Sequence, residues 1–120
     1  MRTEEANKLI DKAIEVVDKK GLDAGALEEI LKEAREYAKK EEDALVTKTL
    51  RLIYEYIDEN EAFDIEVSIE EEDEEEDFEQ EEMTDIENLK YLLELIKKSE
   101  NTYNREEIKG YRSELWDALY

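Results

Sequence analysis

The most concentrated chemistry in this sequence is carboxylate chemistry, because residues 70–77 are eight consecutive acids and Phe78, Glu79, Gln80, Glu81 and Glu82 follow them. Carboxylates bind hard cations, but the chain contains no loop of the D-x-[DN]-x-[DN]-G type. They also act in pairs in glycosidases. In a chain with 38 Asp and Glu residues, however, a carboxylate pair carries almost no information about catalysis.

Other side-chain chemistry is largely excluded by residues that the chain lacks. It has no His and no Cys, and its only serines are Ser68, Ser99 and Ser113. General acid and base catalysis near neutral pH usually uses His, and nucleophilic catalysis uses Cys, or Ser beside a base. Zinc sites use Cys and His. We therefore expect no catalytic residues, no metal site and no cofactor, and we expect a protein that is not an enzyme.

The acidic charge is confined to one part of the chain. Residues 1–51 have a net charge of −2 and residues 90–120 have a net charge of 0, whereas the 38 residues between Arg51 and Lys90 hold 19 acids and no base. A halophilic surface would distribute its acids over every exposed face. The sequence instead predicts ordinary helices that carry a local acidic device.

The acidic run has a charge spacing similar to that of nucleic acids. An extended chain rises ~3.3 Å per residue, similar to one nucleic-acid strand, and a helix rises ~1.5 Å, near the ~1.7 Å per charge of a duplex. Either conformation would allow the run to replace phosphates on a basic surface, with Phe78 placed where a base would stack. The predicted partner-binding residues are Glu70, Glu71, Glu72, Asp73, Glu74, Glu75, Glu76, Asp77, Phe78 and Glu79. A solvated, inert spacer is the alternative.

Apolar periodicity predicts three helices in the N-terminal half, near residues 4–20, 24–39 and 43–59. Thr3 and Asp23 are expected N-caps, and Gly21 is the usual residue just beyond a helix end. Helices two and three could form one long helix. We favour a turn between them, because the polar run that begins at Lys39 offers no apolar contact for five residues.

Two further helices are predicted near residues 85–99 and 105–119. Thr84 to Glu87 form a capping box, and Asn104 to Glu107 form a looser one, with Tyr103 expected to pack on Ile108. Both helices carry apolar residues outside their main stripe, so they should form the centre of the bundle. Alternatively, they offer an apolar interface that includes Trp116 and Tyr120.

Residues 63–69 alternate strictly between apolar and polar side chains, which predicts a short strand with Phe63, Ile65, Val67 and Ile69 on one face. The chain contains no second alternating segment, so this strand would have to pair with its twin in a homodimer or with a partner's sheet. The alternative is an extended stretch that packs these four side chains on the helices without any ladder.

These elements together predict an all-α fold, a small bundle of about five helices with one short strand at most. We expect an N-terminal helical part over residues 1–60, an extended acidic connector over 61–83 and a helical hairpin over 84–120, forming one domain of a size that can bury a core. No apolar run approaches a membrane span or a signal-peptide core, and there is no cysteine. These features favour a cytoplasmic protein.

In charge and size, the chain resembles the DNA-mimic inhibitors of the phage anti-restriction and anti-CRISPR type, although typical mimics spread carboxylates over a whole folded face. The acidic run also resembles the tails of histone chaperones. The resemblance implies a partner that is a basic, nucleic-acid-binding protein, whose binding surface this chain would occupy. A chaperone or adaptor for a basic protein and a structural module with an inert linker are the alternatives. Direct binding to nucleic acid and to membranes is not expected, because the acidic run repels phosphates and no basic stripe is evident.

Overall fold

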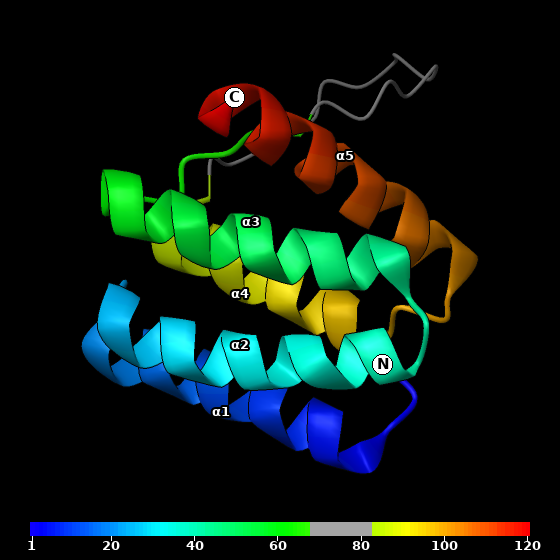
Figure 1. Ribbon diagram of the computed structural model, residues 1–120. Helices are drawn as coiled ribbons and strands as arrows, with labels where there is room; N and C mark the ends of the chain where they lie inside the picture. The colour runs from blue at the N-terminus through cyan, green and yellow to red at the C-terminus, as the bar shows by residue number, and fades with distance from the viewer. Residues whose placement is uncertain (68–82) are drawn as a thin grey trace.

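The computed structural model describes residues 1–67 and 83–120, and this part of the chain folds as five α-helices (Figure 1). They are α1 (Glu4–Lys20), α2 (Ala24–Lys40), α3 (Ala44–Asn60), α4 (Asp85–Lys97) and α5 (Thr102–Leu119). The predicted all-α bundle of five helices is confirmed, and the helices begin and end within a few residues of the predicted positions. None of the described helices is long and apolar enough to cross a membrane.

The helices form a closed ring of neighbours, in which α1 packs on α2, α2 on α3, α3 on α5, α5 on α4, and α4 on α1 (Figure 1). The first three helices alternate in direction. Helix α4 runs antiparallel to α1, because Lys97 pairs with Asp11 and Lys90 pairs with Asp18. Since the last neighbour in the ring returns to the first, the N-terminal and C-terminal helices share one apolar core.

Local sequence explains most of the helix ends. Gly21 follows α1 with a φ of 71°, a left-handed conformation that glycine adopts without strain. The Asp23 side chain accepts a hydrogen bond from the Ala26 N–H and caps α2. Between α2 and α3 the chain turns at Glu41 and Glu42, and the Asp43 side chain caps α3 through the Val46 N–H. The predicted turn between the second and third helices is therefore confirmed.

The most buried helix is α3, in which nine residues are buried, Tyr54 and Tyr56 among them. It lies between α2 and α5, so apolar side chains are needed around most of its circumference. Helix α4 is buried in the same way and contributes four leucines and Ile96 to the core. The expectation that the C-terminal pair lies at the centre of the bundle therefore holds for α4, whereas α5 buries only Ile108, Tyr111 and Leu115.

The start of α5 differs from the prediction. Asn101 is the N-cap, and its side chain accepts hydrogen bonds from the backbone N–H groups of Tyr103 and Asn104. Asn104 lies inside the helix instead and donates a hydrogen bond to the Lys98 carbonyl. Tyr103 is 81% exposed and does not pack on Ile108 as predicted. Two asparagines three residues apart give similar local signals, and the contact with the end of α4 decides between them.

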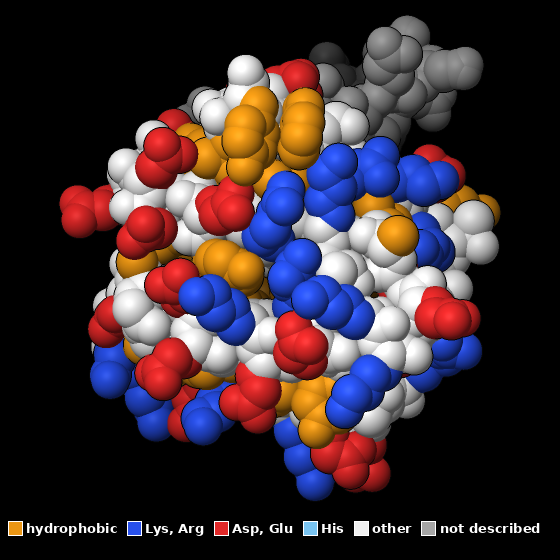
Figure 2. All heavy atoms as spheres, viewed as in Figure 1, with side chains coloured by type: hydrophobic (Ala, Val, Ile, Leu, Met, Phe, Trp, Pro, Cys, Tyr) orange, Lys and Arg blue, Asp and Glu red, His pale blue; other side chains and the backbone are white. Residues whose placement is uncertain are grey.

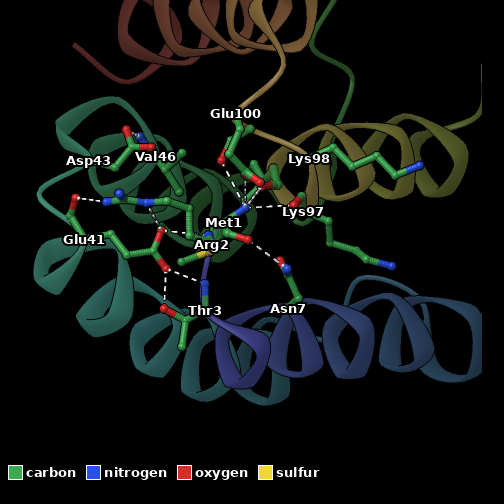
Figure 3. Close-up of polar contacts among 12 residues, drawn as sticks. Met1, Arg2, Thr3, Asn7, Glu41, Asp43, Val46, Lys97, Lys98 and Glu100 are labelled. Carbon is green, nitrogen blue, oxygen red and sulfur yellow. Dashed lines mark hydrogen bonds and ion pairs between the residues drawn. The ribbon is translucent and has the colours of Figure 1, made fainter.

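The first residues of the chain join α1 to the end of α4 (Figure 3). Met1 is 2% exposed, and its ammonium group donates hydrogen bonds to the carbonyl oxygens of Ile96 and Lys97 and to the Ser99 hydroxyl. It also forms an ion pair with Glu100. A cation at this position compensates the negative end of the helix dipole and supplies donors to carbonyls that have no partner within the helix.

Arg2 and Thr3 bind the turn after α2 through the Glu41 carboxylate (Figure 3). This carboxylate accepts hydrogen bonds from both backbone N–H groups and from the Thr3 hydroxyl, whose oxygen lies 2.6 Å away. Burial alone would raise the pKa of Glu41, but these hydrogen bonds outweigh it and lower the pKa. Thr3 is the N-cap of α1 by position, as predicted, yet its side chain makes no capping bond because Glu41 engages it.

We expect an N-terminal extension to destabilise the protein. A Gly-Ser dipeptide placed before Met1 converts the ammonium into a neutral amide with one N–H, which leaves buried acceptors at the end of α4 without donors. The free energy of unfolding should fall by about 1–3 kcal/mol, the cost of unsatisfied buried polar groups. Chemical denaturation followed by circular dichroism measures it. The same dipeptide after the exposed Tyr120 is the control, and equal effects at both ends would contradict the role given to the ammonium.

Candidate functional site

The predicted partner-binding residues Glu70–Glu79 and the predicted strand residue Ile69 lie outside the described residues. The described chain stops at Val67 and resumes at Met83. The residues on both sides of this acidic segment, defined as 68–82, show how it is attached to the helices. Of the other predicted site residues, Phe63, Ile65, Val67, Trp116 and Tyr120 are described, and the structure places them in two separate regions.

The residues before the acidic segment are packed on the helices. Phe63 is fully buried, with its ring edge-on to Tyr56 of α3 and stacked with Tyr111 of α5, at centroid distances of 6.1 and 6.4 Å. Ile65 is buried as well, and Val67 packs against the same core. Over residues 62–67 the chain forms no ladder. The strand predicted for this part is therefore corrected, and the alternative, apolar side chains packed on the helices, describes residues 63–67.

One amide side chain supplies hydrogen bonds of the kind that a neighbouring strand would have made to these residues. The Asn88 Nδ2 of α4 donates hydrogen bonds to the carbonyl oxygens of Phe63 and Ile65, at 3.1 and 2.6 Å. Its Oδ1 accepts from the Tyr111 hydroxyl at 2.6 Å, so this buried amide uses both of its ends. Burial raises the pKa of Tyr111, which keeps the hydroxyl protonated as a donor.

The residues that follow the acidic segment contact the same part of the chain, around Phe63. Asp85, the first residue of α4, accepts a hydrogen bond from the Phe63 N–H at 3.1 Å. Immediately before it, Thr84 and Glu87 form the predicted capping box, with both reciprocal bonds present. Residues 63 and 85 are therefore in direct contact. We call this set of contacts, made by Phe63, Asp85, Asn88 and Tyr111, the junction.

Two further contacts support the junction. The Tyr56 hydroxyl donates to the Asp64 carboxylate, and burial together with this carboxylate raises the pKa of Tyr56 to about 12. On α5, the absence of a side chain at Gly110 allows Val67 to lie close to the helix. A Cβ atom at position 110 would lie 2.6 Å from Val67 Cγ1, well inside normal contact, so a larger residue would displace Val67. Residues 63–67, which precede the acidic segment, are thus held by α3, α4 and α5.

A second site, which the sequence did not predict, is a groove between α2, α3 and α5. We call it the basic groove, because its lining contains four cations and the indole of Trp116, in a volume of about 560 Å³. Figure 2 shows Lys and Arg side chains gathered over the region where α3 and α5 lie. The lining residues are Arg35, Lys39, Glu42, Asp43, Ala44, Thr47, Lys48, Arg51 and Trp116.

The contacts of these cations differ. Lys39 pairs with Glu36 and Arg51 pairs with Glu55, each within its own helix. Arg35 donates to the neutral Thr47 carbonyl at 3.2 Å, and Lys48 lies 4.2 Å from the centroid of the Trp116 ring. Within residues 1–67 and 83–120, neither Arg35 nor Lys48 forms an ion pair. These two side chains are therefore the cations most available to an anionic ligand.

The end of the groove is fixed by an ion pair between helices. Arg105 of α5 holds Asp43 through two hydrogen bonds of 2.9 and 3.1 Å. Burial favours the neutral form of Asp43, but Arg105 and the Val46 N–H outweigh this and lower the pKa of the carboxyl. Asp43 thus caps α3 and ties α5 to it, and Arg105 balances its charge, while Glu42 is the second acid of the groove.

The chemistry of the two regions is that of their hydrogen bonds and charges. Among the described residues, no cluster of three acidic side chains is arranged to hold a metal ion. The junction consists of saturated hydrogen bonds, and the basic groove offers cations and an aromatic ring but no nucleophile with an adjacent base. The arrangement can bind charged partners of both signs, the acidic segment taking cations and the groove taking anions.

Known proteins offer no guide to either region. No protein family, curated protein or solved structure matches the chain. The interpretation of the two regions therefore depends on their own geometry and charge.

We expect the donor side of Asn88 to be essential to the junction. The isosteric change Asn88→Asp puts a carboxylate oxygen against the carbonyls of Phe63 and Ile65, so two acceptors lose their donor. The free energy of unfolding should fall by about 2–4 kcal/mol, as for buried groups left unsatisfied. The matched control is Asn60→Asp on the exposed end of α3, which removes one bond to the Tyr56 carbonyl. Similar losses in both variants, measured by chemical denaturation, would contradict this role.

The Asp43–Arg105 pair should make the free energy of unfolding fall as the solution becomes acidic. The folded-state pKa of Asp43 lies below its ordinary value of 3.8, so its contribution is present above that pH and is lost as the pH falls through the folded-state pKa. At neutral pH, Asp43→Asn should lower the unfolding free energy by about 1 kcal/mol, since Arg105 is partly exposed. This difference from the parent should shrink as the pH falls below about 4. Denaturation at several pH values, with the exposed Asp117→Asn as control, measures it, and a constant difference would refute it.

Proposed function

We propose that this chain is a binding protein that uses its acidic segment to occupy a basic, nucleic-acid-binding surface of a partner protein. In this proposal it is an inhibitor that mimics a nucleic acid, of the anti-restriction or anti-CRISPR type, and it is not an enzyme. The segment 68–82 contains 11 acids and no base. The described residues together carry 27 acids and 17 bases, so about half of the net charge of −21 belongs to these 15 positions.

The observation that supports this proposal most is the contact between residues 63 and 85. An acidic spacer is needed where two elements lie far apart, but the Phe63 N–H already bonds to the Asp85 carboxylate at 3.1 Å. A connection much shorter than residues 64–84 could therefore join these two points of the chain. Connections between helices usually take 2–8 residues, and much longer ones are commonly functional or linkers. Because this one links two points of the chain that already touch, a binding role explains it better than a spacer.

The chemistry of binding follows from the charge of the segment. Each carboxylate that replaces a phosphate faces an Arg or a Lys of the partner, and salt screens this attraction over a Debye length of about 8 Å at physiological ionic strength. Affinity should therefore fall as salt rises. Many weak contacts acting together favour a broad basic groove of the partner over a single binding pocket. Nucleic-acid-binding proteins offer such grooves, because they neutralise several phosphates at once.

The test begins with capture of the partner from the native cell by the full chain. A variant in which Gly and Ser replace residues 70–82 at equal length is the matched control. The partner is then titrated with its nucleic acid, with and without this protein, at low and high salt. We expect the two ligands to exclude each other and the Gly-Ser variant to have no effect. Single Glu→Gln changes should cost about 0–1 kcal/mol of binding, and Phe78→Ala about 1–3 kcal/mol.

Other outcomes of the titration distinguish the alternative functions. Simultaneous binding of this protein and the nucleic acid, with unchanged affinities, would refute mimicry and would favour a chaperone or adaptor for a basic protein. Equal capture by the parent and the Gly-Ser variant would make the segment an inert connector. The variant should retain its helical circular dichroism in every case, because the junction lies outside the replaced residues.

A further inference from the structure

The basic groove has a composition that selects anions. Four cations line it against two acids, and one of those acids, Asp43, is already held by two hydrogen bonds from Arg105. The described part of the chain has ten more acids than bases, so a local excess of positive charge runs opposite to the molecule as a whole. Of the four cations of the groove, the two that form no ion pair in the described residues, Arg35 and Lys48, come from different helices and reach the groove from its α2 and α3 sides.

The aromatic residue of the groove narrows the class of anion. Trp116 is 41% exposed, with Lys48 over its ring and the Tyr120 ring 4.5 Å from it by centroid distance, at an angle of 38°. A nucleobase stacks on a free aromatic face, and here Lys48 and Tyr120 already contact the indole. A carboxylate needs no free face, because it can pair with Lys48 at the edge of the ring. The groove therefore suits carboxylates better than nucleotides.

The chain itself contains a ligand of this class. Residues 70–82 present consecutive carboxylates with one aromatic ring, Phe78, which matches the cations and the indole of the groove. Two copies with a net charge of −21 repel each other at long range. At physiological ionic strength, however, this repulsion is screened over about 8 Å, whereas the molecule is 28 Å across in its shorter dimensions. Ion pairs at contact distance therefore outweigh the repulsion between distant charges.

Geometry favours a segment from another copy over the groove's own. Both ends of the segment are fixed at the junction, where Val67 lies against Gly110 and Phe63 contacts Asp85 of α4. The groove lies between α2, α3 and Trp116, six residues further along α5 and about 120° around that helix from Gly110. A loop closed at both ends would have to pass around α5 to reach it. A second copy meets no such constraint.

We propose that the basic groove binds an acidic peptide segment, and that its occupant is residues 70–82 of a second copy of this chain. The inference uses the proposed function only in taking the acidic segment as a ligand for cations. The contact is head-to-tail, so each copy offers one groove and one segment, and association continues beyond a pair unless the geometry closes. A segment held by a basic partner cannot enter a groove, so an excess of the partner should dissociate the self-associated protein.

The test uses two complementary variants of the full chain. The groove variant carries Arg35→Glu and Lys48→Glu with its segment intact, and the segment variant carries Gln at residues 70–77 with its groove intact. In analytical ultracentrifugation at physiological salt, the parent should gain mass as its concentration rises, and each variant alone should stay monomeric. An equimolar mixture should form a heterodimer and nothing larger, because it has one working groove and one working segment. High salt should dissociate it.

Two controls separate a specific groove from general electrostatics. Lys12→Glu with Lys20→Glu, on the exposed side of α1, makes the same charge change outside the groove and should leave self-association as in the parent. Trp116 is the only tryptophan, so its fluorescence reports on the groove alone. Addition of a synthetic peptide with the sequence of residues 70–82 to the segment variant should change this fluorescence, and Lys48→Glu in that background should raise the peptide's dissociation constant by about tenfold.

The remaining outcomes overturn the proposal. A parent that is monomeric at all concentrations and salts, with a peptide that leaves Trp116 fluorescence unchanged, would show that the groove takes no acidic peptide. A fluorescence difference between parent and segment variant that does not depend on concentration would assign the groove to the chain's own segment instead of a second copy. Capture of a partner by the groove variant tests the proposed function separately, since that variant keeps its acidic segment.

Discussion

The structure depends on one buried side chain, the amide of Asn88, which supplies the backbone hydrogen bonds needed where the chain leaves the helices ahead of the acidic segment. A chain that departs from the core exposes backbone carbonyls that need donors, and here two of the departing residues, Phe63 and Ile65, are buried. Asn88 donates to the carbonyls of Phe63 and Ile65, while its oxygen is held by Tyr111 of α5. One residue of α4 thus joins α5 to the chain that follows α3.

The distribution of charge has a similar logic. In the helical body, several exposed cations form ion pairs with an acid one turn away in the same helix, as Lys19 does with Glu15 and Lys32 with Glu28. Such exposed pairs add little stability, and the body still carries ten more acids than bases. Charge of one sign is most concentrated at two locations, since the acidic segment holds 11 acids and no base and the basic groove gathers four cations against two acids.

The sequence predicts those features that depend on neighbours along the chain. Gly21, Asp23 and the box from Thr84 to Glu87 each act within one turn, and all three appear in the structure as predicted. The alternation from Phe63 onward correctly predicted an apolar face but not its partner, because a side-chain amide from a distant helix supplies the bonds that a second strand would have made. The start of α5 was wrong for a similar reason, since contact with α4 chose between two asparagines.

The basic groove was beyond prediction because its residues come from three helices and lie as far apart in sequence as Arg35 and Trp116. Each cation, taken alone, reads as a solvated side chain of an amphipathic helix. One local signal was present. Arg105, Lys109, Arg112, Trp116 and Tyr120 recur every three or four residues and so form one stripe along α5. Recognising that this stripe faces α3 requires the packing of the two helices, shown by the Tyr120 hydroxyl bound to Glu55.

The contact between residues 63 and 85 also bears on how such a protein diversifies. A connection whose ends already meet can change in length and composition without moving the elements it joins, because residues 63 and 85 hold those ends together. If the partners changed, the sequence of the helical body would be inherited almost unaltered while the sequence of the acidic segment would change rapidly. Descendants of one ancestor would then share Asn88 and its neighbours while differing in target, much as the framework of an antibody outlasts its variable loops.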